Sequence, residues 1–160
     1  MRRVTTTVTL NNQQVRAEAP PHYTLLRWLR DLVGAHEVKE GCGEGVCGAC
    51  TVLVDGRPVS SCCVLAVEVD GAEVCTSRGL LHRDGTLSRL QQCFWEAGAA
   101  QCGFCTQGML ITASALLASG AKPSREEIRE ALRGNLCRCT GYQAIVNAVE
   151  RAASAPEVPA

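Results

Sequence analysis

Most of the eleven cysteines in this 160-residue chain fall into two sets of four, each spaced to hold a metal centre. The first set occupies a glycine-rich segment and one downstream position: Cys42, Cys47, Cys50 and Cys62. The second set consists of two close pairs with a long segment between them: Cys102 and Cys105, then Cys137 and Cys139. Thiolate sulfur binds zinc ions and iron-sulfur clusters alike. The sequence therefore predicts two separate metal centres.

The first set has the spacing C-x4-C-x2-C followed by a distant fourth cysteine, which is the plant-type ferredoxin spacing for a 2Fe-2S cluster. Glycines alternate with these cysteines: Gly41, Gly43, Gly45 and Gly48. A tight loop around a cluster needs positive φ angles and backbone N–H groups aimed at the sulfurs, and glycine permits both. Cys63 directly follows Cys62 and is a second candidate for the fourth ligand, although the spacing favours Cys62.

In the second set, each cysteine pair comes just before a run of residues with helical periodicity. An oxidised 2Fe-2S cluster with four thiolate ligands is a dianion, and helix N-termini favour negative charge. We therefore expect two helix N-termini to converge on this second cluster.

A structural zinc site is the main alternative for each set, because it uses the same thiolates in a tetrahedral array. The x4 loop is wider than a usual zinc knuckle, which favours iron and sulfide. Disulfides are a second alternative, but no apolar export segment follows Arg2 and Arg3, so we expect a cytoplasmic protein with reduced thiols. Cys63, Cys75 and Cys93 are expected to be small buried apolar residues.

The composition limits the possible functions. With 46% hydrophobic residues, 4% aromatics and no formal net charge, the chain is expected to form one or two small domains with an aliphatic core. It has no basic run for nucleic acids or membrane surfaces, and no apolar run of membrane-spanning length. It also lacks a nucleotide-binding glycine motif and an acid/base or nucleophile constellation, so we expect no catalytic site on this chain.

Hydrophobic patterns indicate which elements position the cysteines. Alternation of apolar and polar residues predicts a hairpin over residues 4–19, a strand over 51–54 that returns toward Cys62, and a second hairpin over 64–74. Apolar residues at helical spacing predict a helix over 24–34. Strands, one helix and further strands make a compact mixed sheet, which resembles the β-grasp of plant-type ferredoxins.

From about residue 80 the pattern becomes helical and predicts four short helices. Ser124 and Glu127 form a capping box for the third helix, and Thr140 can cap the fourth. We expect a small bundle that its cluster helps to stabilise, with a frayed tail over residues 155–160. The resulting fold class is α+β, with one domain over residues 1–79 and a second over 80–160.

Three segments together resemble a known family: GCGEGVCGACTV at 41–52, QCGFCT at 101–106 and GNLCRCTGY at 134–142. They look like the signatures of the small iron-sulfur subunit of molybdenum hydroxylases, the group of xanthine oxidase, aldehyde oxidoreductase and carbon monoxide dehydrogenase. The resemblance extends over nearly the whole chain. It implies a ferredoxin-like β-grasp domain followed by a four-helix bundle, with one 2Fe-2S cluster in each.

The resemblance also implies roles. Cys102, Cys105, Cys137 and Cys139 match ligands of the cluster nearer a molybdopterin cofactor, and Cys42, Cys47, Cys50 and Cys62 match ligands of the cluster nearer FAD. Gln101 matches a glutamine that approaches the molybdopterin on the large subunit. Electrons would pass between molybdenum and FAD on a medium subunit, within a dimer of heterotrimers. A stand-alone iron-sulfur or zinc redox-sensing module is the alternative.

Gln107 departs from the family pattern, because a proline usually follows Cys-Thr at this point. The second predicted helix therefore begins without a fixed φ angle. We expect the cluster to tolerate this change, since no ligand is altered.

Overall fold

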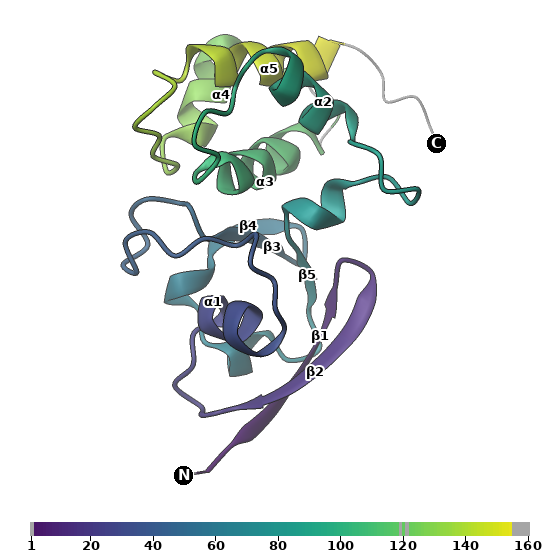
Figure 1. Ribbon diagram of the computed structural model, residues 1–160, viewed down its shortest axis with the longest axis vertical. Coiled ribbons are helices and arrows are strands. Elements are labelled where there is room, and N and C mark those ends of the chain that lie inside the picture. Colours follow the sequence, from purple (N-terminus) through teal and green to yellow (C-terminus); the bar gives the residue numbers. More distant parts are fainter. Residues whose placement is uncertain (1, 119, 121, 155–160) are drawn as a thin grey trace.

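The computed structural model describes residues 2–118, 120 and 122–154, and it stacks a helical half on a sheet half (Figure 1). All five strands lie between residues 4 and 75, and the α-helices of the other half follow residue 88. The expected α+β class is confirmed, whereas the predicted fraying of residues 155–160 lies outside the described residues. Within those residues, no helix combines the length and apolar character needed to span a bilayer.

Five strands form one mixed sheet in the order β2-β1-β5-β3-β4. The strands are β1 Val4–Leu10, β2 Gln13–Ala19, β3 Thr51–Val54, β4 Arg57–Ser60 and β5 Glu73–Cys75. Strands β1 and β2 are an antiparallel hairpin, as predicted, and Asn11 and Asn12 both adopt positive φ in its turn. Strand β5 lies parallel to β1 and antiparallel to β3, and β3 is antiparallel to β4.

The second predicted hairpin, over residues 64–74, is wrong. Ala66–Val69 forms a 3-10 turn, and β5 is inserted between β1 and β3. Asp70 accepts a hydrogen bond from the Thr7 N–H at 2.7 Å, so this connection is tied to β1 and does not fold back on itself. Alternation over so few residues does not distinguish a strand from a short helical turn.

The helix of the sheet half begins where the sequence predicts. α1, Leu25–Arg27, continues as a π-helical turn over Trp28–Leu32, and the Thr24 hydroxyl accepts the Arg27 N–H at 3.3 Å as its cap. Trp28 is fully buried and donates its indole N–H to the Ala17 carbonyl of β2 at 3.4 Å. The core around it is mostly aliphatic: Val8, Leu25, Leu26, Leu29, Val38, Val52 and Val74.

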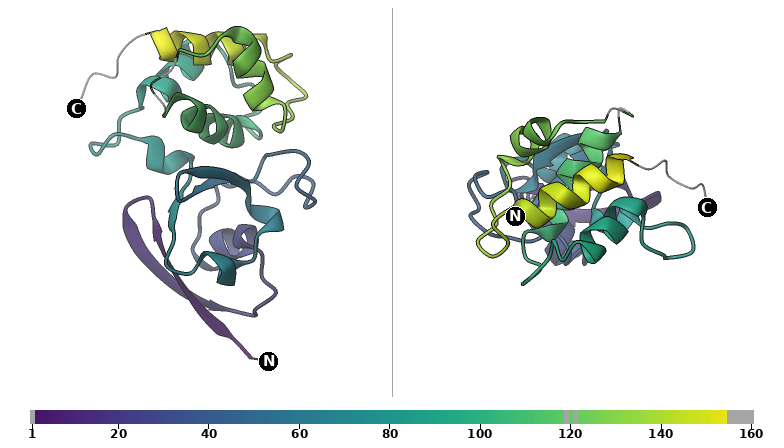
Figure 2. Two further views of the ribbon diagram at one scale, coloured as in Figure 1. Left: turned by 180° about the vertical axis from the view of Figure 1, so that it is seen from behind. Right: turned by 90° about the horizontal axis from the view of Figure 1, so that it is seen from above.

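Four helices form the other half, as predicted: α2 Arg89–Glu96, α3 Thr106–Leu117, α4 Arg125–Leu132 and α5 Gln143–Ser154. α5 packs against α2 and α4 and lies across the end of the molecule that is remote from the sheet (Figure 2). The capping box of Ser124 and Glu127 is confirmed, and Ser88 and Gln91 form another at α2. An ion pair between Arg151 and Glu96, at 2.6 Å, joins α5 to α2.

The predicted cap of the fourth helix is wrong. α5 begins at Gln143, and the preceding Tyr142 has a φ angle of 66°, which interrupts the chain between Thr140 and the helix. The Thr140 hydroxyl accepts the Tyr142 N–H at 3.3 Å within this loop. Thr140 therefore shapes the cysteine loop and does not cap α5.

Helix α3 forms the contact between the two halves, because it packs against β3 and β4 of the sheet as well as against α4 (Figure 1). The first cysteine loop precedes β3, and Cys105 directly precedes α3. This packing therefore brings the two cysteine sets to the same junction.

Candidate iron-sulfur sites

The structure groups the eight predicted ligand cysteines into pairs of neighbouring thiols. These pairs are Cys42 with Cys47, Cys50 with Cys62, Cys102 with Cys139 and Cys105 with Cys137. In the described part of the chain, no group of three or more His, Cys, Asp or Glu side chains is arranged to hold a single metal ion. Each iron of a 2Fe-2S cluster takes two thiolates, whereas a structural zinc ion takes four ligands around one centre. Pairs of thiols within each set therefore fit the two-iron cluster.

In the first set, which we call the loop site (Cys42, Cys47, Cys50 and Cys62), backbone N–H groups surround the Cys42 sulfur. The donors are the N–H groups of Glu44, Val46 and Cys47, at 3.3–3.4 Å. Hydrogen bonds to the thiolate stabilise its charge, and these three lower the pKa of Cys42 to about 6. The loop therefore favours the anionic form that binds iron.

The loop glycines serve this wrapping in two ways. Gly43, Gly45 and Gly48 have φ angles of 67–78°, as predicted, and such angles turn successive N–H groups to one side of the chain. Gly41 is not at positive φ, contrary to the expectation. A Cβ atom there would lie 2.7 Å from the Cys47 sulfur, so this glycine is required for close approach.

Cys62 is the cysteine that reaches the loop site, since it is buried beside Cys50. Burial, together with the Cys50 thiol, raises the pKa of Cys62 to about 12. The Cys63 sulfur lies 3.7 Å from that of Cys62, but Cys63 is exposed, so the expectation that it is buried is wrong. A Cβ atom on Gly45 would lie 2.8 Å from the Cys63 sulfur, so Cys63 also lies close to the loop backbone.

In the second set, which we call the helical site (Cys102, Cys105, Cys137 and Cys139), side-chain hydroxyls add to the backbone contacts at Cys137. The Cys137 N–H donates to the Tyr142 hydroxyl at 2.8 Å, and the Thr140 hydroxyl donates to the Cys137 sulfur at 3.1 Å. Burial opposes ionisation of Cys137, yet the Thr140 hydrogen bond leaves its pKa below the usual value. The cysteine spacing predicts neither contact, although Thr140 and Tyr142 both lie in the third family-like segment.

Only one helix begins at a cysteine of the helical site. Cys105 is the residue directly before α3, whereas Thr140, Gly141 and Tyr142 separate Cys139 from α5. The expectation of two converging helix N-termini is therefore met by α3 alone.

One side of the helical site is buried and the other is open. Burial and the neighbouring Cys137 raise the pKa of Cys105 to about 12. Cys102 and Cys139 are exposed, with their sulfurs 3.6 Å apart, and Gln101 is exposed beside them. The open side is where another chain could approach a cluster held by these thiols.

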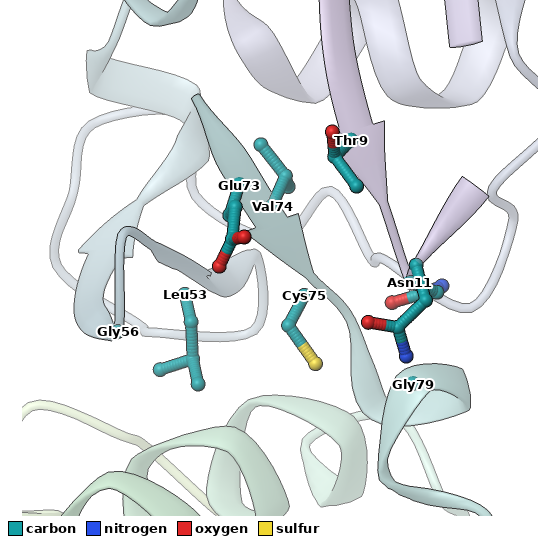
Figure 3. Close-up of a pocket in the computed structure, with 9 residues that line it drawn as sticks. Thr9, Asn11, Leu53, Gly56, Glu73, Val74, Cys75 and Gly79 are labelled. Carbon is teal, nitrogen blue, oxygen red and sulfur yellow. The ribbon is translucent and has the colours of Figure 1, made fainter. Parts of the chain in front are cut away.

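The remaining cysteines lie apart from both sites. Cys93 is fully buried in the helical core, as expected. Cys75 is partly buried and points into a small pocket that Asn11, Leu53 and Gly79 also line (Figure 3). Burial raises the pKa of Cys75, and a Cβ atom on Gly79 would lie 2.7 Å from its sulfur.

Comparisons with known proteins agree with this division into halves. The family described as a 2Fe-2S iron-sulfur cluster binding domain matches residues 8–78, and the family described as a [2Fe-2S] binding domain matches residues 76–150. Both the fold and the cysteine-bearing segments thus define a protein with two 2Fe-2S-binding domains.

Among similar proteins, the chain is 49% identical over 158 residues to the nicotinate dehydrogenase small FeS subunit of Eubacterium barkeri, covering 96% of this chain and 100% of that one. It is 46% identical over 151 residues to the xanthine dehydrogenase iron-sulfur-binding subunit of Escherichia coli O157:H7, covering 91% and 92% of the two chains. A chain of quinoline 2-oxidoreductase from Pseudomonas putida 86 superimposes with a TM-score of 0.92 at 42% identity, covering 96% of each.

The chain therefore belongs to the small 2Fe-2S subunits of molybdenum hydroxylases, and it is an iron-sulfur electron-transfer subunit of such a complex. The family predicted from the three sequence segments is confirmed. This membership argues against the stand-alone sensor module.

Proposed function

We propose that the loop site and the helical site each hold one 2Fe-2S cluster and that the chain relays electrons between molybdopterin and FAD on partner subunits. The proposed ligands are Cys42, Cys47, Cys50 and Cys62 in the loop site, and Cys102, Cys105, Cys137 and Cys139 in the helical site. When bound, the clusters supply one-electron redox chemistry.

The observation that carries this proposal is the pairing of thiols within each site. A two-iron cluster needs two thiolates at each end, and each site offers two neighbouring pairs. Backbone N–H groups at Cys42 and the Thr140 hydroxyl at Cys137 stabilise the negative charge of these two thiolates independently of any metal. The same hydrogen bonds hold these two sulfurs in fixed orientations.

The open side of the helical site faces molybdenum in this proposal. Gln101 stands beside the exposed Cys102, so its amide is placed to meet a cofactor on the large subunit. The loop site, in the other half of the chain, then lies on the FAD side, and the medium subunit covers it. We further propose a dimer of heterotrimers in the cytoplasm, where clustered thiols stay reduced.

The boundary between the two domains is proposed at residues 79 and 80. The last strand of the sheet ends at Cys75, and the 3-10 turn Ser77–Leu80 leads away from it toward α2. On this division, residues 1–79 carry the loop site and residues 80–160 the helical site.

Metal and sulfide analysis of the purified complex tests the proposal. The small subunit is expected to contribute about four irons and about four acid-labile sulfides. The value is obtained by subtracting the contribution of the other subunits, purified separately. Zinc in place of iron, or half the expected sulfide, would reject the assignment of a cluster to each site.

A further inference from the structure

The two cysteine sites are joined by buried contacts that the cysteine spacing does not predict. We call these contacts the seam; they lie between residues 47–51 on one side and residues 107–108 and 134–136 on the other. Gln107 is 6% exposed and lies two residues after Cys105. Its amide nitrogen donates to the Ala49 carbonyl at 2.6 Å and to the Thr51 carbonyl at 3.1 Å. These carbonyls flank Cys50 of the loop site, so a side chain of one site holds the backbone of the other.

Asn135 makes the matching contact from the other end of the helical site. It is 4% exposed and lies two residues before Cys137. Its amide nitrogen donates to the Gly48 carbonyl at 3.0 Å and to the Thr51 hydroxyl at 3.3 Å. Its oxygen accepts the Thr112 hydroxyl of α3 at 2.8 Å, which fixes the orientation of the amide.

A backbone hydrogen bond connects the two sites directly. The Leu136 N–H, next to Cys137, donates to the carbonyl of Cys47 at 2.8 Å. Together with the amides of Gln107 and Asn135, this bond restrains the segment 47–51 at several points along its length. Both ligand cysteines of this segment are therefore tied to residues that flank ligand cysteines of the helical site.

The backbones of the two sites approach each other closely at two glycines. A Cβ atom on Gly108 would lie 2.1 Å from the Gly48 carbonyl oxygen, and one on Gly48 would lie 2.3 Å from the Gly134 carbonyl oxygen. Direct backbone approach of this kind fixes the separation of two segments more tightly than contact between flexible side chains. The spacing of the two sites is thus set by hydrogen bonds on one hand and by steric contact on the other.

We propose that Gln107 and Asn135 are positioning residues that fix the distance and orientation between the two clusters. This inference rests on the proposed ligand assignment. Gln107 supplies two hydrogen bonds that a proline at this position could not make. The fixed φ angle of a proline is thus replaced by hydrogen bonds between the two domains. The expectation that only the helix start is affected at Gln107 is therefore incomplete.

The test compares Gln107→Met and Asn135→Asp with the parent, each in the complete complex, by electron paramagnetic resonance after full reduction. Two nearby paramagnetic clusters split or broaden each other's signals. Each variant removes amide donors at nearly constant side-chain volume. Gln107→Met also removes an amide oxygen that has no partner among the described residues, so it need not destabilise the fold. We expect weaker magnetic interaction, with the iron content and the number of signals unchanged.

A second pair of variants changes the distance by sterics. Gly108→Ala places a methyl group against the Gly48 carbonyl and should separate the two sites, with loss of the splitting. Gly134→Ala is the matched control, because it lies in the same seam but its Cβ would have no atom within 4 Å. It should behave as the parent does.

The outcomes are distinct for the two proposals. Loss of iron or of a whole signal from the parent complex would reject the ligand assignment itself. Full iron content with the same splitting in Gln107→Met, Asn135→Asp and the parent would overturn the positioning role while leaving the clusters in place. If Gly108→Ala fails to assemble, the two amide variants decide the question.

Discussion

Backbone N–H groups converge on the Cys42 sulfur of the loop site, whereas a side-chain hydroxyl joins the backbone groups at the Cys137 sulfur of the helical site. Three N–H groups converge on the Cys42 sulfur, and glycines at positive φ make this possible. At Cys137 the Thr140 hydroxyl donates to the sulfur, and the Tyr142 hydroxyl accepts the backbone N–H. The two sites should therefore respond to different mutations: the loop site to changes in backbone conformation, and the helical site to the removal of single hydroxyl groups.

The largest expected effect is the loss of one cluster without the other. Replacing Cys137 or Cys139 by Ser should abolish one of two paramagnetic signals and about half of the iron, because each site has its own four thiols. Cys50→Ser should remove the other signal. Loss of both signals from either replacement would contradict the independence of the two sites.

A backbone change should damage the loop site next most strongly. Gly48→Ala puts a side chain at a φ angle of 67° and 2.3 Å from the Gly134 carbonyl oxygen, so the free energy of unfolding should fall by about 3 kcal/mol. Denaturant unfolding of the small subunit measures this change.

Gly56→Ala is the control for this effect. It has a φ angle of 77° but open space around its Cβ, so only the backbone cost of about 1 kcal/mol is expected. Equal losses in the two variants would mean that contact across the seam is not tight.

A hydroxyl change should act on the helical site alone and more gently. Thr140→Val removes the donor to the Cys137 sulfur, which stabilises negative charge by about 1–2 kcal/mol. Because the reduced cluster is the more negative, its reduction potential should fall. A potentiometric titration followed by electron paramagnetic resonance resolves the two signals. A shift of the loop-site potential instead would reverse the assignment.

The smallest effect is expected at the spare cysteine beside the loop site. Cys63 is exposed, and it is Cys62 that lies beside Cys50, so Cys63→Ser should retain both signals and the full iron content. Iron analysis with spectroscopy of the reduced complex measures both. If the loop-site signal disappears in this variant, Cys63 and not Cys62 is the fourth ligand.

Much of the fold could be predicted because its signals are local. The hairpin of residues 4–19 alternates cleanly, and Ser124 with Glu127 marks the start of α4. The position of β5 could not be predicted in this way. It depends on contacts with β1, which is remote in sequence: β5 pairs with β1, and Asp70 accepts the Thr7 N–H.

The cysteine sets could likewise be predicted from spacing, whereas the contacts between them could not. Gln107 and Asn135 are ordinary polar residues in the sequence, and their roles arise only when α3 packs on β3. The position of Thr140 in the sequence suits a helix cap, but the positive φ of Tyr142 moves the helix start beyond it. Packing between segments remote in sequence thus determines the contacts of these residues, which the local sequence pattern does not predict.

The most direct test of the two-site account is spin quantitation of the fully reduced complex by electron paramagnetic resonance. The account predicts two spectroscopically distinct 2Fe-2S species in the small subunit, each integrating to about one spin. A single species after complete reduction, with no second signal at any temperature, would contradict the division of the eight thiols into two clusters.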